Sequence, residues 1–103
     1  MTPADLQALS DCAQLASSNA WAFRRAGTWQ QFAHIREQAY ERVTMGWTPF
    51  GPVETSILLS IIDILLQGPT LEIRVPAPPG PEILARLREF LAQPVPDAPE
   101  VVL

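Results

Sequence analysis

The stretch PVETSILLSIIDILL, Pro52 to Leu66, is the most apolar part of this 103-residue chain and decides its fold. Pro52 suits the first position of a helix, and Glu54 lies in the first turn, where the helix dipole favours a negative charge. Its polar residues form one narrow line, which consists of Ser56, Ser60, Asp63 and, just beyond the stretch, Gln67. A helix that is apolar around most of its circumference is usually covered on more than one side. We therefore expect this helix at the centre of the molecule.

The same stretch is too short to cross a membrane. Its apolar run, Ile57 to Leu66, is interrupted by Ser60 and Asp63. The run is about half the roughly 20 residues that a bilayer-spanning helix needs. Met1 is followed by neither a basic start nor an apolar run, so the sequence indicates a cytoplasmic protein.

Two helices are expected before the central one. Thr2, Pro3 and Asp5 make a helix start, and Thr28 with Gln31 has the spacing of a capping box. Apolar residues then recur at steps of three and four. The first stripe is Leu6, Leu9, Ala13, Ala16, Ala20 and Phe23, and the second is Trp29, Phe32, Ala33, Ile35, Ala39, Tyr40 and Val43. The short connection around Gly27 predicts an antiparallel hairpin, with a weak point at 17–19 where the first segment could break into two helices.

Part of this hairpin resembles a known helical repeat. Residues 20–43, with FRRAGTW at 23–29 and Ala39 in the second helix, resemble a single tetratricopeptide helix pair. The resemblance covers about a quarter of the chain. The family has a small residue early in the second helix, where this chain has Phe32. It has a proline at the close of the repeat, where this chain has Thr44, and no second copy of the repeat follows. The resemblance implies a helical hairpin and does not extend to membership of the family.

A short strand and a last helix are expected after the central helix. Thr70 to Val75 alternates polar and apolar residues with a period of two, which is typical of a strand with one buried face. A helix is predicted from Pro81 to about Gln93. Its inward side consists of Ile83, Leu84, Leu87, Phe90 and Leu91. The predicted fold is mainly α, a small α+β domain over residues 1–93, followed by a proline-rich tail over 94–103.

The predicted strand needs a partner, because an unpaired strand leaves its backbone groups without hydrogen bonds. One candidate is residues 100–103, lying parallel to it with the last helix as the crossover. The other is the same strand of a second copy, antiparallel across a two-fold axis. We favour the second arrangement and predict a homodimer. Its expected interface consists of Leu71, Ile73, Val75, Ile57 and Ile61.

Composition excludes several classes of protein. The net charge of −4, from seven arginines and eleven acidic residues, opposes general binding to duplex nucleic acid. One cysteine and one histidine exclude disulfide frameworks and zinc modules built from Cys and His alone. Phosphate-binding glycine loops and the signatures of hydrolases, zinc proteases and kinases are absent from the sequence. Enzymatic activity is therefore unsupported, and no cofactor or metal is predicted.

Aromatic and arginine residues gather between positions 21 and 50, a composition typical of protein-binding hot spots and of platforms for single-stranded nucleic acid. Most of these rings are expected to fill the core. Five residues flank the turn and the Pro/Gly loop instead of the helix stripes. These predicted partner-binding residues are Trp21, Arg24, Arg25, Trp47 and Phe50.

Three residues could have either a structural or a chemical role. His34 shares a helix face with two glutamates, but a metal site would need ligands from other helices, so a solvated face is expected. Cys12 is expected to be a buried, inert thiol and not a nucleophile activated by His34. Asp63 must be paired, hydrogen-bonded or neutral if it is buried in so apolar a helix. It is expected in an ion pair, at an interface or, with Trp29, in a ligand pocket.

These observations predict a small accessory or adaptor protein that binds another protein and also associates with itself. The alternative is a regulatory protein that binds a small ligand between the central helix and the hairpin. Single-stranded nucleic-acid binding is disfavoured by the acidic total, and no membrane association is expected.

Overall fold

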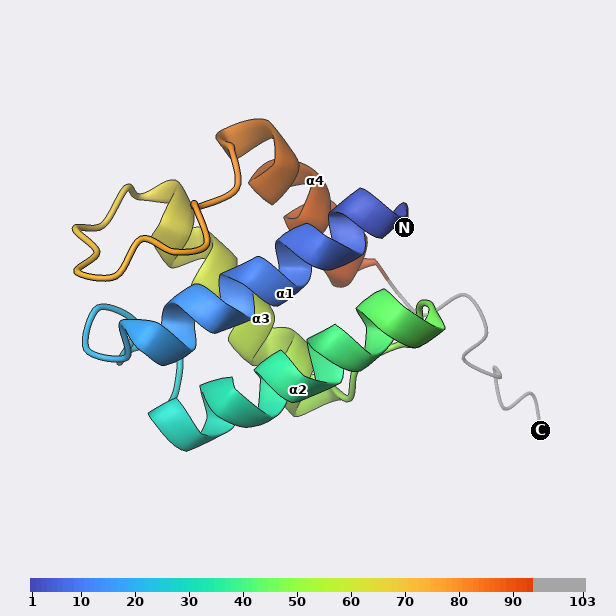
Figure 1. Cartoon of the computed structure of the whole chain (residues 1–103), viewed down its shortest axis with the longest axis horizontal. Coiled ribbons are helices and arrows are strands. Elements are labelled where there is room, and N and C mark those ends of the chain that lie inside the picture. The colour runs from blue at the N-terminus through green and yellow to red at the C-terminus, as the bar shows by residue number, and fades with distance from the viewer. Residues whose placement is uncertain (94–103) are drawn as a thin grey trace.

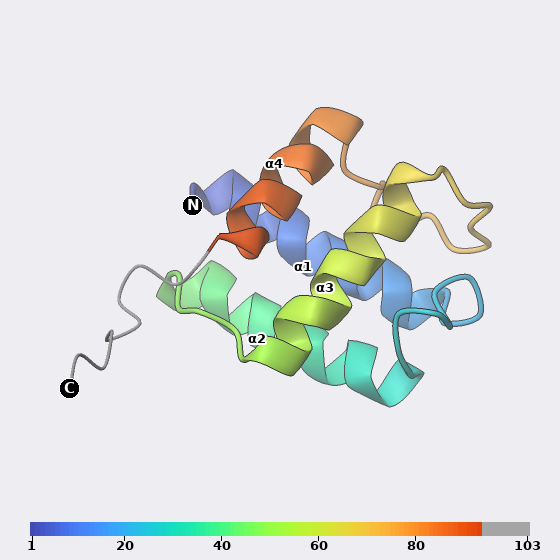
Figure 2. The same ribbon diagram turned by 180° about the vertical axis from the view of Figure 1, so that it is seen from behind.

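The computed structural model describes residues 1–93, and these residues form four helices. They are α1 (Pro3–Ser18), α2 (Trp29–Met45), α3 (Pro52–Leu66) and α4 (Pro81–Ala92). The helices lie in two layers, with α1 and α2 antiparallel in one layer and α3 and α4 in the other (Figures 1 and 2). The mainly helical prediction is confirmed. None of the helices in this part of the chain is long and apolar enough to span a membrane.

The predicted helix starts are confirmed by their capping geometry. The hydroxyl of Thr2 accepts a hydrogen bond from the backbone N–H of Asp5, whose carboxylate accepts one from the N–H of Thr2. Thr28 and Gln31 form the same reciprocal pair at the start of α2. Each pair satisfies backbone N–H groups that have no partner within the helix, which fixes where the helix begins.

The apolar helix α3 is central, as its pattern predicts. It packs against α4 and α1, and six of its side chains are buried. These six are Ile57, Leu58, Ile61, Ile62, Ile64 and Leu65. Two of them, Ile57 and Ile61, were expected in a dimer interface, but the chain's own helices cover both. Self-association is therefore not needed to bury this helix.

An ion pair joins the start of α1 to α4. The Nε of Arg86 donates to Oδ1 of Asp5 at 3.2 Å, and Nη2 of Arg86 donates to the same oxygen. The hydrogen bonds from Arg86, with those from Thr2, lower the pKa of Asp5 below its ordinary value, although burial opposes the shift. On the other side of α4, Leu84, Leu87 and Leu91 are buried in the core.

The predicted strand at Thr70–Val75 is wrong, because residues 1–93 contain no strand. The segment is irregular and bends at Glu72. Its backbone is held at one residue by a side chain. The N–H of Ile73 donates to Oδ1 of Asn19 at 2.9 Å, and Nδ2 of Asn19 donates to the carbonyl of Ile73 at 2.8 Å. One amide side chain thus makes the two hydrogen bonds that a neighbouring strand would make.

Asn19 also ends α1. Its backbone N–H and its Nδ2 both donate to the carbonyl of Leu15, at 2.9 and 3.0 Å. Residues 19–26 then form a series of turns, so the expected break at 17–19 is present but no second short helix follows it. The other suggested partner of the strand, residues 100–103, and the proline-rich tail lie outside the described residues.

We predict that Asn19→Ala lowers the free energy of unfolding by about 1–3 kcal/mol, because it leaves the backbone groups of Ile73 without their partner. Asn19→Asp should cost more than Ala, since a carboxylate cannot donate and would face two carbonyl oxygens. Urea denaturation of the three proteins measures both differences. Equal stability of the wild type and Asn19→Ala would contradict this role of Asn19.

Candidate functional site

One end of the molecule is built from two connections that lie side by side: the turns between α1 and α2, and the segment between α3 and α4 (Figures 1 and 2). The amide of Asn19 joins them at Ile73, and Nη2 of Arg25 donates to Oε1 of Gln67 at 3.3 Å. Residues of both connections, Trp21 and Glu72 among them, line a hollow of about 330 Å³. The two connections therefore form one continuous surface.

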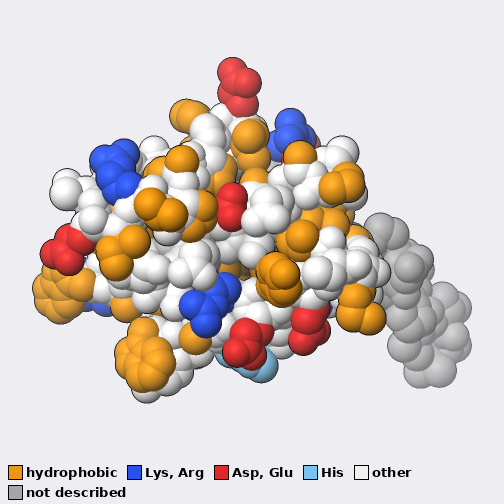
Figure 3. All heavy atoms as spheres, viewed as in Figure 1, with side chains coloured by type: hydrophobic (Ala, Val, Ile, Leu, Met, Phe, Trp, Pro, Cys, Tyr) orange, Lys and Arg blue, Asp and Glu red, His pale blue; other side chains and the backbone are white. Residues whose placement is uncertain are grey.

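This end exposes large apolar side chains. Trp21 and Val75 are each 77% exposed and Ile73 is 48% exposed, although large apolar residues normally favour the interior. Figure 3 shows apolar side chains at the surface here, with charged side chains beside them. We call this area the turn surface and define it by six exposed residues, which are Trp21, Arg24, Arg25, Ile73, Arg74 and Val75.

The turn surface is basic although the chain as a whole is acidic. Residues 19–28 and 67–78 hold three arginines and one acidic residue, Glu72, whereas the chain carries a net charge of −4. The ion pairs among residues 1–93 use Arg86 and Arg88, and none of them lies on the turn surface. The guanidinium of Arg24 lies 4.2 Å from the ring centroid of Trp21, within the range of a cation–π interaction.

The structure separates the five predicted partner-binding residues into two groups. Trp21, Arg24 and Arg25 precede α2, whereas Trp47 and Phe50 follow it. The 17 residues of α2 span about 25 Å. A single small contact surface therefore does not contain both groups.

Trp47 and Phe50 instead form an aromatic cluster with Phe90 of α4. The ring centroid of Trp47 lies 5.8 Å from that of Phe50 and 5.1 Å from that of Phe90, both in edge-to-face geometry. Phe50 is buried and Trp47 is partly buried against the core. The sequence did not indicate Phe90 as a member of this cluster. The cluster packs the loop after α2 against α4.

Arg42 holds the same loop in place. Its Nε and Nη2 donate to the carbonyls of Thr48 and Pro49, at 2.6 and 3.0 Å, and its guanidinium lies 3.8 Å from the ring centroid of Phe50. The loop contains prolines and glycines and cannot form helical hydrogen bonds, so these contacts satisfy its carbonyls. Partial burial lowers the pKa of Arg42 from its ordinary value.

The predicted ligand-pocket residues do not enclose a buried site. Oδ1 of Asp63 accepts a hydrogen bond from Nε of Arg88 at 2.6 Å, and both side chains are about half exposed. Trp29 is 60% exposed at the start of α2. Asp63 is therefore in a surface ion pair between α3 and α4, which was the first of its three expected roles.

Cys12 is a fully buried thiol, and burial raises its pKa to about 12. Such a thiol is protonated at neutral pH and cannot act as a nucleophile. His34 is exposed, and its Nε2 lies 3.0 Å from Nε2 of Gln38. Residues 1–93 contain no group of three or more Cys, His, Asp or Glu side chains that could hold a metal ion.

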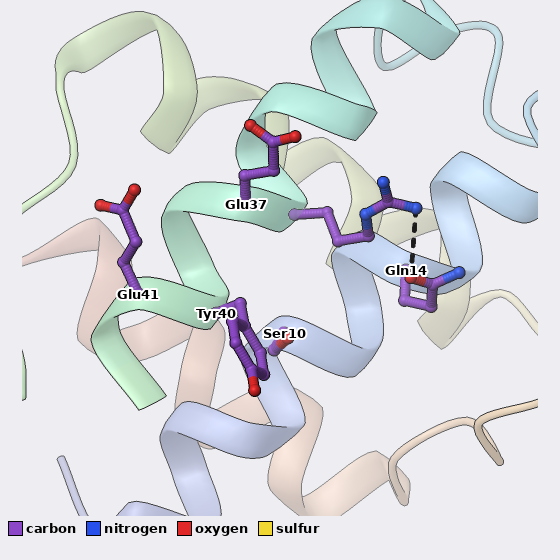
Figure 4. Close-up of a pocket in the computed structure, with 6 residues that line it drawn as sticks. Ser10, Gln14, Glu37, Tyr40 and Glu41 are labelled. Atoms are coloured by element: carbon purple, nitrogen blue, oxygen red, sulfur yellow. Dashed lines mark hydrogen bonds between the residues drawn. The ribbon is translucent and has the colours of Figure 1, made fainter. Parts of the chain in front are cut away.

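A polar groove lies between α1 and α2. Its volume is about 460 Å³, and its lining is Ser10, Gln14, Arg36, Glu37, Tyr40 and Glu41 (Figure 4). Nη1 of Arg36 donates to Oε1 of Gln14 at 3.4 Å across the groove. The apolar side predicted for α2 included Tyr40, but Tyr40 is 60% exposed here. The sequence did not indicate this groove, because its residues come from two helices.

No family model, curated protein or solved structure matches this chain.

We predict that truncating Trp47 destabilises the fold, whereas truncating Trp21 leaves its stability almost unchanged. Trp47→Ala removes a ring packed between Phe50 and Phe90 and should lower the free energy of unfolding by about 2–4 kcal/mol. Trp21→Ala removes an exposed ring and should change it by less than about 0.5 kcal/mol. Chemical denaturation distinguishes the two sites. A larger loss from Trp21→Ala than from Trp47→Ala would contradict these assignments.

Proposed function

We propose that this chain is a small cytoplasmic accessory or adaptor protein that acts by binding another protein through the turn surface and by associating with itself. The observation that carries the proposal is the exposed Trp21 beside Arg24 and Arg25. Tryptophan and arginine are the residues most enriched in the hot spots of protein interfaces. The ring of Trp21 offers a large apolar area, and the two guanidinium groups offer planar, bidentate hydrogen bonding.

The charge of the turn surface limits the kind of partner. Arg24 and Arg25 have no carboxylate partner among the described residues, so an acidic surface can pair with them. Complementary charge speeds association and excludes basic partners. A duplex nucleic acid would also supply negative charge, but the net charge of −4 opposes its approach. We therefore propose a protein partner with acidic residues around an apolar site.

The binding test uses Trp21→Ala/Arg25→Ala, which removes the exposed ring and one guanidinium. We expect retention of the protein partner to fall by at least about tenfold, because hot-spot truncations commonly cost more than 1.4 kcal/mol. The partner is first identified by co-purification and mass spectrometry with the wild-type chain. Retention of the purified partner is then compared quantitatively between variants.

The matched control is Tyr40→Ala, which removes an aromatic side chain that is 60% exposed but lies on α2, outside the turn surface. This variant should bind the partner as the wild type does. Circular dichroism should be unchanged in both variants. Undiminished binding by Trp21→Ala/Arg25→Ala, or equal loss in the control, would refute the turn surface as the binding site.

A small-ligand role is the second candidate function, and the groove between α1 and α2 supports it. Its volume of about 460 Å³ lies within the range of small-molecule sites, and it contains both charges and the Tyr40 ring. A metabolite that occupied it should raise the melting temperature, because binding to the native state alone stabilises by mass action. Glu37→Trp, a change at an exposed lining residue, should fill the groove and abolish that rise. A melting temperature unchanged by a panel of charged metabolites would argue against this role.

A further inference from the structure

The segment that holds Ile73 directs two backbone groups away from Asn19. The amide of Asn19 binds both the N–H and the carbonyl of Ile73, so these two groups point toward Asn19. In a planar trans peptide the N–H and the carbonyl point in opposite directions. The carbonyl of Glu72 therefore points away from Asn19, and so does the N–H of Arg74. Neither has a hydrogen-bond partner among residues 1–93.

These two groups are the ones that an antiparallel bridge requires. In a non-hydrogen-bonded antiparallel pair, the two residues face each other but exchange no backbone hydrogen bond. The flanking hydrogen bonds run from the N–H of the residue that follows one member of the pair to the carbonyl of the residue that precedes the other member. A two-fold axis beside Ile73 would join the N–H of Arg74 to the carbonyl of Glu72 in the second copy. The same axis generates the reciprocal hydrogen bond. The exposed backbone is thus complementary to itself.

The side chains are complementary in the same register. Antiparallel pairing about Ile73 places Glu72 of each copy opposite Arg74 of the other, which makes two cross-strand pairs of opposite charge. It also brings the two Ile73 side chains together, and each of them is 48% exposed in the single chain. A shift of the register by one residue would place the charged Glu72 or Arg74 opposite the apolar Ile73.

We infer that this chain forms a two-fold symmetric dimer through residues 72–74, centred on Ile73, with Glu72 of each copy paired to Arg74 of the other. The inference rests on the self-association proposed above and assigns a surface and a register to it. The occupant is a second copy because charge, backbone polarity and apolar contact are all self-complementary about one residue. Ile57 and Ile61 of α3 take no part, since both are already buried within the single chain.

The test is a charge swap in the full chain, measured by sedimentation over a wide range of concentrations. The wild type is expected to show a concentration-dependent dimer. Glu72→Arg places arginines opposite each other, and Arg74→Glu does the same with glutamates. Because both pairs in the dimer become repulsive, each single variant should dimerise at least about tenfold more weakly.

Mixing the two single variants should restore the dimer. In the mixed pair, both arginines of one chain face both glutamates of the other, so a heterodimer is expected where neither variant alone associates. The double variant Glu72→Arg/Arg74→Glu carries the same composition as the wild type and should dimerise like it. Circular dichroism and melting temperature confirm that all variants keep the fold.

The possible outcomes distinguish a failure of the proposed register from a failure of self-association itself. A wild type that remains monomeric at millimolar concentration overturns both. A wild-type dimer that the single charge reversals do not weaken overturns this register and leaves association through another surface. Failure of the mixed single variants to associate also overturns the register, because the charges would then not face one another.

Discussion

The pairing of the Asn19 amide with the backbone of Ile73 joins the two halves of this chain at one end of the molecule. It ends α1, because Nδ2 of Asn19 also binds the carbonyl of Leu15. It holds the connection between α3 and α4 against the turns between α1 and α2. The turn surface exists only because these two connections are held side by side. The exposed backbone at Glu72 and Arg74 takes its direction from the same two hydrogen bonds.

The other constraint is the burial of α3. A chain of this length buries somewhat over 60% of the surface that the extended chain exposes. Burying one highly apolar helix therefore requires contacts from much of the rest of the chain. The helices around α3 supply this cover, and the polar side of the helix is used as well, since Asp63 binds Arg88 of α4. Large apolar side chains nevertheless remain exposed at the turn surface, where Trp21 and Val75 are each 77% exposed.

Local signals predicted the helices well. The capping pairs at Thr2 and Thr28 and the prolines at 52 and 81 lie within one turn of the helix starts that they determine. The central position of α3 followed from its composition alone. The ion pair between Asp5 and Arg86 was not predicted, because the capping role of Asp5 already explains an acidic residue at this position. Its partner lies 81 residues away in the sequence.

The predicted strand is wrong for a different reason. Alternation over Thr70–Val75 indicates which side chains are buried, but it does not say what binds the backbone. Here the partner is a side chain 54 residues away. The predicted contact surface combined residues that precede and follow α2, and the length of that helix separates them. Trp47 resembled Trp21 in its position beside a turn, and only the packing against Phe90 distinguishes the two.

Amide hydrogen exchange of Ile73 and Arg74, followed by NMR at increasing protein concentration, tests the central claim most directly. In dilute solution the amide of Ile73 should be protected and that of Arg74 should exchange freely, because only Ile73 is bonded within the chain. As the concentration rises, the amide of Arg74 should become protected as well. An unprotected Ile73 amide would contradict the pairing with Asn19, and an Arg74 amide that exchanges freely in a dimer would contradict the bridge that this pairing directs.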